Sequence, residues 1–348
     1  MSIEEITLPS FFCPFLPAVS PYAEAVHQHT LEWVRRHALI KDERAFEHLR
    51  SSKFGWLAAR AHPNAPLEGV TIASDWFTWL FLMDDECDEC GIGKRPERLA
   101  ALQGQFLRVL SGGQPEAPLD PEFRDVRKRI DVPLLHALCD LRDRMEARMP
   151  RAWRARFIHS VVEYFESSKW EAANRARGIW PDAPTYIRMR PYTGALYTDI
   201  ELIDMTEGIA LPLAVRKHPL VQRLMLITNN VVCWSNDIFS LPKERAHLDM
   251  HNLALILQHK EEIPLQTAVD RVAVLTDKEV RRFIELEALL PSFGAPLDAD
   301  VRRFIGVLRA WMRGNLDWSY ESGRYRPTVA SAPMNVPEHQ AAGLGVNQ

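Results

Sequence analysis

Two clusters of oxygen-bearing side chains in this sequence have the types and the spacing to bind a divalent cation. Asn236, Ser240 and Glu244 stand four residues apart, and on one helix they span an arc of about 80° along roughly 12 Å of its axis. Asp84-Asp85-Glu86-Cys87-Asp88 reads D-D-x-x-D, and Asp84 and Asp88 share a helix face. Such oxygens suit a hard cation like Mg²⁺, which also takes phosphate oxygens as ligands. One such cluster alone is more often a solvated polar face, whereas the pair favours a metal site.

Aromatic and aliphatic side chains precede the aspartate cluster on the same helix face. Phe81, Leu80 and Phe77 lie three, four and seven residues before Asp84, while Trp79 points to another side, where we expect it to pack against a neighbouring helix. Each of these side chains alone is more often plain core. Because aromatic faces stabilise cations, the group beneath a metal cluster indicates a pocket for an apolar substrate that becomes cationic.

Basic side chains recur at three further places. Arg190 is followed by Pro191 and Gly194, and these two residues inside a helical stretch predict a local break. Lys243 adjoins Glu244, and the pair Arg324-Tyr325 follows the last helical stretch. Arginine offers a bidentate fork for phosphate and tyrosine adds a hydroxyl donor, so these residues are typical of an anionic phosphate ligand.

Two rival metal or redox patterns are weaker. Cys87-Asp88-Glu89-Cys90 is a C-x-x-C pair, but no second Cys pair or suitably spaced His pair follows it. His247 and His251 lie four residues apart without H-E-x-x-H order, which predicts surface histidines.

The elements that must position these residues are helices. Apolar residues recur at three- and four-residue spacing almost throughout, prolines fall between the periodic stretches or in first turns, and no alternating Val/Ile/Thr run indicates a sheet. One all-α domain with long helices around a central aromatic-lined cavity is therefore expected. The predicted helices are Tyr22–Arg36, Asp42–Arg60, Leu67–Met83, Pro96–Leu110, Pro133–Met149, Ala152–Arg177, Pro184–Ile209, Pro219–Leu241, Ile263–Leu290 and Ala299–Ser322.

Composition excludes several function classes. A net charge of −4 and a pI near 6.3 favour neither nucleic acid nor an anionic membrane surface as a partner. No apolar run reaches the length of about 18–20 residues that a membrane span needs, and the N-terminus lacks the pattern of a signal peptide. The five cysteines are scattered and odd in number. These features predict a cytoplasmic protein with reduced thiols.

Three segments are expected. Residues 1–20 are rich in Pro and Phe and predict an extended segment laid over the domain. Residues 21–326 form the helical domain. Residues 327–348 are rich in Pro, Ala, Gly and Asn without periodicity, which predicts a disordered tail.

Together these motifs resemble the bacterial class I terpene synthases, or terpene cyclases. The resemblance covers roughly residues 10–326 and rests on D-D-x-x-D at Asp84–Asp88, N-D-x-x-S-x-x-K-E at Asn236–Glu244, and Arg324-Tyr325. Family members also carry a diphosphate-sensing arginine about 46 positions before the Asn of the second motif, and Arg190 stands at that position. Each motif is moderately specific alone, and the ordered set is strong.

The resemblance implies a role for each matching residue. It implies Mg²⁺ ligation by Asp84 and Asp88 and by Asn236, Ser240 and Glu244, with Asp85 accepting hydrogen bonds from basic residues when the site closes. Thr193 and Gly194 would be the linker and effector at the helix break, although some relatives have Asp at the linker position. The diphosphate-binding residues would be Arg190, Lys243, Arg324 and Tyr325, and the cavity side chains would be Phe77, Leu80, Phe81 and Trp318.

The implied reaction is Mg²⁺-dependent ionisation of a linear isoprenoid diphosphate followed by carbocation cyclisation. Farnesyl diphosphate, and hence a sesquiterpene hydrocarbon or alcohol, is the expectation for a family member of this length, and a homodimer is compatible with the resemblance. Two alternatives stay open: a chain-elongating prenyltransferase, which would need a second Asp-rich motif, and a non-catalytic isoprenoid-diphosphate binding protein.

Overall fold

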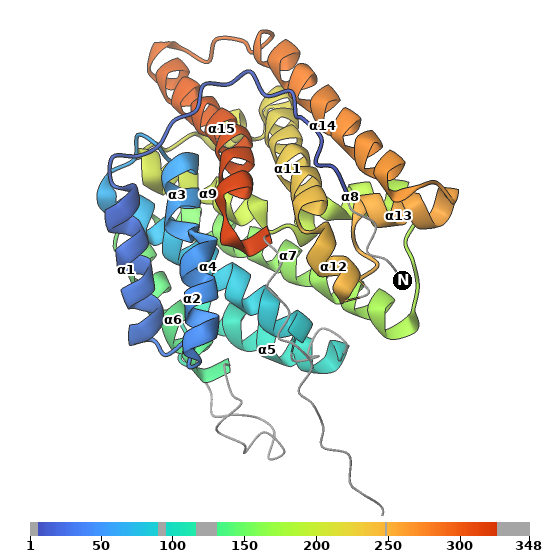
Figure 1. Ribbon diagram of the computed structural model, residues 1–348. Coiled ribbons are helices and arrows are strands. Elements are labelled where there is room, and N and C mark those ends of the chain that lie inside the picture. Colours follow the sequence, from blue (N-terminus) through green and yellow to red (C-terminus); the bar gives the residue numbers. More distant parts are fainter. Residues whose placement is uncertain (1–5, 90–94, 116–130, 248, 326–348) are drawn as a thin grey trace, which may run out of the picture.

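In a computed structural model that describes residues 6–89, 95–115, 131–247 and 249–325, every regular element is a helix (Figure 1). This confirms the expected all-α fold with long helices. The helices are α1 Ala23–Arg36, α2 Glu43–Ser52, α3 Phe54–Ala61, α4 Leu67–Glu89, α5 Pro96–Leu110, α6 Asp131–Glu146, α7 Arg151–Arg177, α8 Ala183–Thr193, α9 Leu196–Glu207, α10 Leu213–Arg216, α11 Pro219–Phe239, α12 Leu241–Ala246, α13 Leu253–Glu261, α14 Leu265–Glu287, α15 Ala295–Glu321 and the 3₁₀ turn η4 Gly323–Tyr325.

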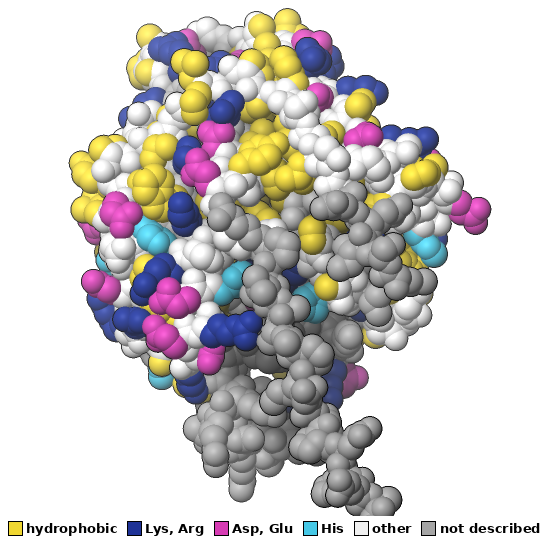
Figure 2. Space-filling view, in the orientation of Figure 1, with side chains coloured by type: hydrophobic (Ala, Val, Ile, Leu, Met, Phe, Trp, Pro, Cys, Tyr) yellow, Lys and Arg dark blue, Asp and Glu magenta, His cyan; other side chains and the backbone are white. Residues whose placement is uncertain are grey.

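The helices form one bundle in which α11 packs between α14 and α15, while α3 packs against α1, α4 and α15 (Figure 1). One continuous cluster of buried apolar side chains runs from α1 to α15, with a second beneath α11, α13 and α14. Among the described residues, no helix has both the length and the apolar character needed to cross a membrane. Basic and acidic side chains are interspersed over the face seen in Figure 2.

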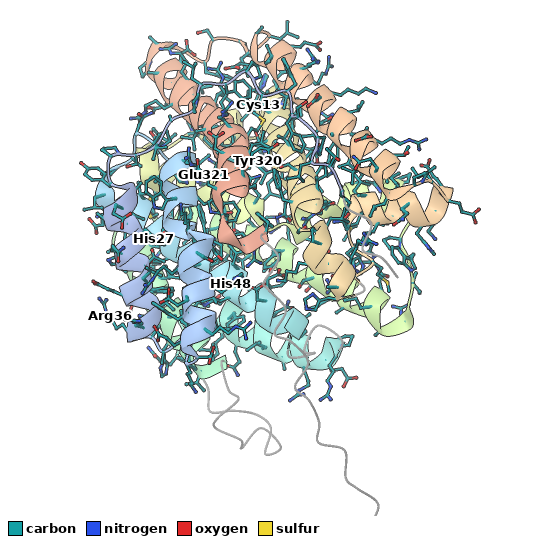
Figure 3. The ribbon with its side chains drawn as sticks, viewed as in Figure 1. Cys13, His27, Arg36, His48, Tyr320 and Glu321 are labelled. Carbon is teal, nitrogen blue, oxygen red and sulfur yellow. The ribbon has the colours of Figure 1, made fainter. Side chains whose placement is uncertain are left out.

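The segment that begins the described chain, residues 6–20, contains no helix or strand and lies against α14 and α15 (Figure 1). The amides of Thr7 and Phe12 donate to side chains of α14, Gln266 at 2.9 Å and Asp277 at 2.7 Å. Figure 3 labels Tyr320 on the last turns of α15, and its hydroxyl donates to the carbonyl of Pro9 at 3.2 Å. Residues 1–5 and 327–348, on which part of the segment prediction falls, lie outside the described residues.

The prediction of one helix over Asp42–Arg60 is wrong, because Lys53 adopts a left-handed conformation (φ 54°) and separates α2 from α3. The reason is packing. A Cβ on Gly55 would lie 2.4 Å from the backbone of His27, so α3 approaches α1 too closely for α2 to continue straight into it. The Lys53 carbonyl accepts the amides of Trp56 and Leu57, and the indole of Trp318 on α15 donates to the carbonyls of Ser52 and Lys53 at 2.8 and 3.1 Å, which holds the break against α15.

Other helix limits also differ from the predictions. Helix α4 continues beyond Met83 through the aspartate cluster to Glu89, and α15 begins at Ala295 rather than Ala299. Helix α13 was not predicted, because its buried residues Leu253–Leu257 form a continuous apolar run without the helical period. The predicted helix over Pro184–Ile209 divides into α8 and α9 at Gly194-Ala195, close to the break that Pro191 and Gly194 indicated.

Candidate active site

The second motif forms a nearly continuous helical stripe across the junction of α11 and α12. Ser240 keeps a helical conformation between the two helices, its amide donates to Asn236 O at 2.8 Å, and the Glu244 amide donates to Ser240 O at 3.0 Å. Two i-to-i+4 hydrogen bonds therefore connect Asn236, Ser240 and Glu244 across the junction. Asn236, Ser240 and Glu244 keep the shared face that their spacing predicted.

The three oxygen-bearing side chains of this stripe are held by protein groups. Asn236 Oδ1 accepts from Arg190 Nη2 at 2.9 Å, and its Nδ2 donates to the Tyr325 hydroxyl at 2.8 Å. Ser240 Oγ donates to Asn236 O at 2.7 Å, and Glu244 Oε2 accepts from an asparagine outside the motif, Asn252, at 2.6 Å. The side chains of the stripe thus contact α8, the 3₁₀ turn η4 and the residue that begins α13.

Glu244 carries a carboxyl whose charge is poorly compensated. Burial, together with the nearby carboxylates of Asp237 and Asp249, raises its pKa to about 8. Among the described residues no three His, Cys, Asp or Glu side chains gather as metal ligands, since this motif offers one carboxylate beside an amide and a hydroxyl oxygen. All three donors are oxygens, the type that hard divalent cations prefer.

The end of α4 approaches this stripe through Asp85. Lys243 Nζ donates to Asp85 Oδ1 at 2.5 Å, while Arg324 donates to both carboxylate oxygens at 2.9 Å. Burial alone would favour the neutral acid, but the two cations hold the pKa of Asp85 well below its usual range. Arg324 belongs to η4, which packs on α2, where a Cβ on Gly323 would lie 2.3 Å from Ser51 Oγ. The predicted hydrogen bonding of Asp85 to the basic residues is therefore present.

Asp84 differs from its neighbour. Its side chain is exposed in this structure and makes no ion pair, and the protein around it together with the Asp85 carboxylate raises its pKa. Asp88 lies on the same helix, but its side chain, like those of Glu86, Cys87 and Glu89, is outside the described part of the chain, as is Cys90. Of the two aspartates whose side chains are described here, Asp84 is the one whose carboxylate is not paired with a basic side chain.

Arg190 projects from α8 onto α11. Its Nε donates to Asp237 Oδ1 at 2.9 Å, and its Nη2 lies 2.8 Å from the same oxygen. Asp237 is fully buried and also accepts from the Tyr186 hydroxyl and the Leu253 amide at 3.0 and 2.9 Å. Although burial by itself favours neutral arginine, Asp237 holds the pKa of Arg190 above its ordinary value. Arg190 is therefore a charged group shared between Asp237 and Asn236.

The break after α8 lies directly beside this arginine. Ala195 is left-handed (φ 58°), and a Cβ on Gly194 would lie 2.3 Å from Cys233 Sγ on α11, so only glycine fits there. Asn229 Nδ2, also from α11, donates to the carbonyl of Pro191 at 2.8 Å. Thr193 is buried, and its hydroxyl lies 3.5 Å from the Arg190 carbonyl. Thus α11 carries the second motif and also holds the break.

The predicted cavity side chains fall into two groups, and Phe81 is half-buried whereas Phe77, Leu80 and Trp318 are buried. Phe81 stacks on Phe54 at 4.5 Å between ring centroids, lies 6.0 Å from Trp318, and carries the Arg324 guanidinium 4.5 Å above its ring. Phe77 lies deeper, with its ring 5.0 Å from Trp311, and Leu80 is also buried. Trp79 donates to the carbonyl of Leu134 on α6 at 2.9 Å, which confirms that it points to another side.

The model of the family described as "Terpene synthase family 2, C-terminal metal binding" matches residues 75–282, more than half of the chain. This chain belongs to the terpene synthase family. The (+)-T-muurolol synthase of Roseiflexus castenholzii is 40% identical to it, over 92% of this chain and 94% of that protein. Germacrene A synthase of Nostoc punctiforme is 36% identical, over 93% and 96%. Cucumene synthase, a solved structure, has a TM-score of 0.77 at 29% identity, covering 91% of this chain and all of that one.

Several residues at the centre of this synthase site were not singled out by sequence analysis. Asp237, Tyr186 and Asn252 form the buried layer behind Asn236 and Glu244, and Phe54 supplies the ring against Phe81. The adjacency of Asp237 to Asn236 in the second motif was a usable signal for one of them. The other three approach from distant segments, so no local pattern marks them.

The prediction of two surface histidines is half wrong. His247 is exposed, but His251 is buried, with its ring nitrogens 3.2 Å from Asn174 Nδ2 and 3.2 Å from Asp249 Oδ1. Its burial follows from its place directly before Asn252, where the chain turns into α13 beneath α11. His251 is a hydrogen-bonded core residue of the synthase.

Proposed function

We propose that this terpene synthase ionises farnesyl diphosphate in a Mg²⁺-dependent reaction and cyclises the resulting cation to a sesquiterpene. The observation that carries the proposal is one hydrogen-bonded network. In it, Asp85 of α4 bonds Lys243 of α12 and Arg324 of η4, and the neighbouring Tyr325 bonds Asn236 of α11. The network thereby links Asp85, which lies within the predicted metal motif of α4, to the second motif through basic side chains and Tyr325.

The chain length of the substrate is inferred from the relatives. The muurolol synthase is named as a cyclase of (2E,6E)-farnesyl diphosphate, and it matches nearly the whole of this chain. Family membership favours cyclisation over the two alternatives of chain elongation and binding without turnover. The second motif also presents Asn236, Ser240 and Glu244, where elongation would need another Asp-rich cluster.

The residues present fit a divalent cation. Among the described residues Asp84 and Glu244 are not paired with a basic side chain, and Asn236 and Ser240 add neutral oxygens. We propose Asp84 and Asp88 from α4, and Asn236, Ser240 and Glu244 from the second motif, as the ligands. When bound, Mg²⁺ supplies positive charge that stabilises the departing diphosphate.

The basic residues have a separate task in this proposal. Arg190, Lys243 and Arg324 all present N–H donors at the edge of the network, and Tyr325 adds its hydroxyl. They would bind the diphosphate oxygens as the allylic C–O bond breaks, because charge-assisted donors bind developing negative charge most strongly. Thr193 and Gly194 would transmit this contact to the reacting carbon through the break that adjoins Arg190.

The apolar layer beneath the network would receive the isoprenoid chain. Phe77, Leu80, Phe81 and Trp318 are the proposed contacts, and their ring faces can stabilise a passing cation. The ion pairs of Asp85 would close the mouth over the substrate, which keeps water from quenching the carbocation.

The deciding experiment is incubation of the purified protein and Mg²⁺ with geranyl, farnesyl and geranylgeranyl diphosphates separately, with gas chromatography–mass spectrometry of the extracts. We expect a cyclic C15 hydrocarbon or alcohol from farnesyl diphosphate that disappears when EDTA is added. A cyclic product from another chain length would replace the substrate assignment. Longer diphosphates formed with added isopentenyl diphosphate would instead indicate a prenyltransferase.

A further inference from the structure

Asn252 is a buried residue outside both metal motifs that contacts one of the proposed ligands. It is 0% exposed and is the N-cap residue of α13. Its Oδ1 accepts hydrogen bonds from the amides of Ala254 and Leu255 at 2.9 and 3.2 Å. These bonds satisfy two amides that the first turn of every helix leaves free.

The capping bonds also fix which way the Asn252 amide faces. Because backbone amides only donate, the atom facing Ala254 and Leu255 must be the carbonyl oxygen, and the NH₂ group must face the other side. There Nδ2 donates to Glu244 Oε2 at 2.6 Å and to the carbonyl of Asp237 at 2.5 Å. Both hydrogens of the amide are thus used, and every polar group of this side chain is satisfied.

The carbonyl of Asp237 is available because the helix steps between α11 and α12. In a continuous helix the amide of Leu241 would donate to this carbonyl, but Leu241 begins α12 and the two do not form that bond. The NH₂ group of Asn252 donates hydrogen bonds to the Asp237 carbonyl and to the Glu244 carboxyl. It therefore ties the start of α13 to the last proposed ligand of the second motif.

The charge of this contact matters as much as its geometry. The Asn252 amide orients the Glu244 carboxyl and brings no positive charge of its own, so this contact adds no charge that would repel a cation. Lysine or arginine at the same place would compete with the cation, as Lys243 and Arg324 do at Asp85.

We propose that Asn252 is a positioning residue that aims the Glu244 carboxylate at the divalent cation. The inference rests on the proposed function, because it assumes that Glu244 is a metal ligand. It goes beyond the motif by assigning a role to a residue eight positions after Glu244, on another helix. Partners that orient metal ligands typically change metal affinity by about 10–100-fold when they are replaced.

The test is Asn252→Ser compared with Asn252→Ala and the wild-type protein. Serine keeps an N-cap acceptor but is too short to reach Glu244, whereas alanine removes both functions. Binding of Mn²⁺ in the presence of inorganic diphosphate is measured by electron paramagnetic resonance, and thermal unfolding is measured without metal. We expect Asn252→Ser to unfold within a few degrees of wild type and to bind Mn²⁺ about 10–100-fold more weakly.

The outcomes separate the inference from the function that it rests on. If wild type binds Mn²⁺ and Asn252→Ser binds it equally well, Asn252 is only a helix cap and the inference is overturned. If wild type binds no Mn²⁺, the proposed metal site fails, and the inference fails with it. If Asn252→Ser does not fold, Asn252→Asp replaces it, since it preserves the side-chain shape and the capping oxygen; Mn²⁺ affinity equal to wild type in that variant also overturns the inference.

Discussion

Glu244 and Asp85 are acidic residues on opposite sides of the same site, and their surroundings differ in kind. Glu244 receives a neutral amide donor from Asn252, and burial and nearby carboxylates raise its pKa to about 8. Asp85 receives Lys243 and Arg324, which hold its pKa well below the usual range. No basic side chain among the described residues pairs with Glu244 on α12, so a bound cation would have to displace the carboxyl proton at neutral pH, while the charge of Asp85 on α4 is already engaged by basic side chains. In the proposed function, this difference separates metal binding from closure of the site.

The strongest way to break this comparison is to remove the available carboxylate with Glu244→Ala. We expect kcat to fall by roughly 10²–10³-fold or more, the scale of losing one stabilising contact at a developing charge. The fold should stay intact, because the carboxyl that is removed has no charged partner in this structure. Steady-state turnover and circular dichroism check both parts. Turnover at the wild-type rate would remove the second motif from the proposed metal site.

Arg190 tests whether the second motif and the helix break act together. Arg190→Lys keeps a positive charge beside the buried Asp237 but cannot donate through Nε and Nη2 at once. We expect single-turnover ionisation to slow about 10²-fold. The matched variant Arg190→Ala should in addition lose stability, by about 3–5 kcal/mol, because it leaves Asp237 buried without its cation. An unchanged ionisation rate in Arg190→Lys would contradict the sensing role.

The α4 side of the comparison is tested with two separate single variants, Asp84→Asn and Asp85→Asn. Asp85→Asn should lower kcat about tenfold, equivalent to roughly 1.4 kcal/mol, and should increase water-quenched acyclic alcohol, because Arg324 and Lys243 lose the carboxylate charge and one of its two acceptor oxygens. Its dependence on Mg²⁺ concentration should stay near that of wild type, whereas Asp84→Asn should need more Mg²⁺. Product analysis across a Mg²⁺ titration distinguishes the two. If both variants behave identically, Asp84 and Asp85 do not have the separate roles proposed for them.

The parts of this site that local spacing encodes could be predicted. Asn236, Ser240 and Glu244 lie on one face because four-residue spacing survives the helix junction, and Trp79 points away because its offset from Asp84 requires it. Family resemblance added Arg190, which the structure places on Asn236.

Other features depend on contacts between distant segments. At the break at Lys53, Gly55 packs against the backbone of His27, and the Trp318 indole donates to the Ser52 carbonyl. Likewise Asn252 meets Glu244 only because α13 returns beneath α11. The spacing of residues in the sequence does not predict these contacts, because tertiary packing brings the distant segments together.

His62, which packs beside Phe77, is a third buried titratable group, and it has no charged partner at all. Its Nδ1 lies 3.0 Å from the Thr206 hydroxyl, and burial lowers its pKa to about 3. The folded protein therefore binds fewer protons here than the unfolded chain, whose His pKa is near 6.5. The stability that His62 contributes is present above pH 6.5 and is lost as pH falls toward 3, by at most about 1.4 kcal/mol per pH unit.

His62→Gln isolates this contribution, because glutamine can keep a hydrogen bond to Thr206 but cannot be protonated in this range. At pH 7.5 we expect the variant to retain near-wild-type turnover, the smallest effect of the series. Urea unfolding from pH 7.5 to 4 should show the wild-type free energy of unfolding decreasing more steeply than that of His62→Gln. Parallel pH profiles would mean that His62 is solvated or protonated in the folded state. The apolar layer beneath Asp84 would then admit water, which is incompatible with a site that protects a carbocation.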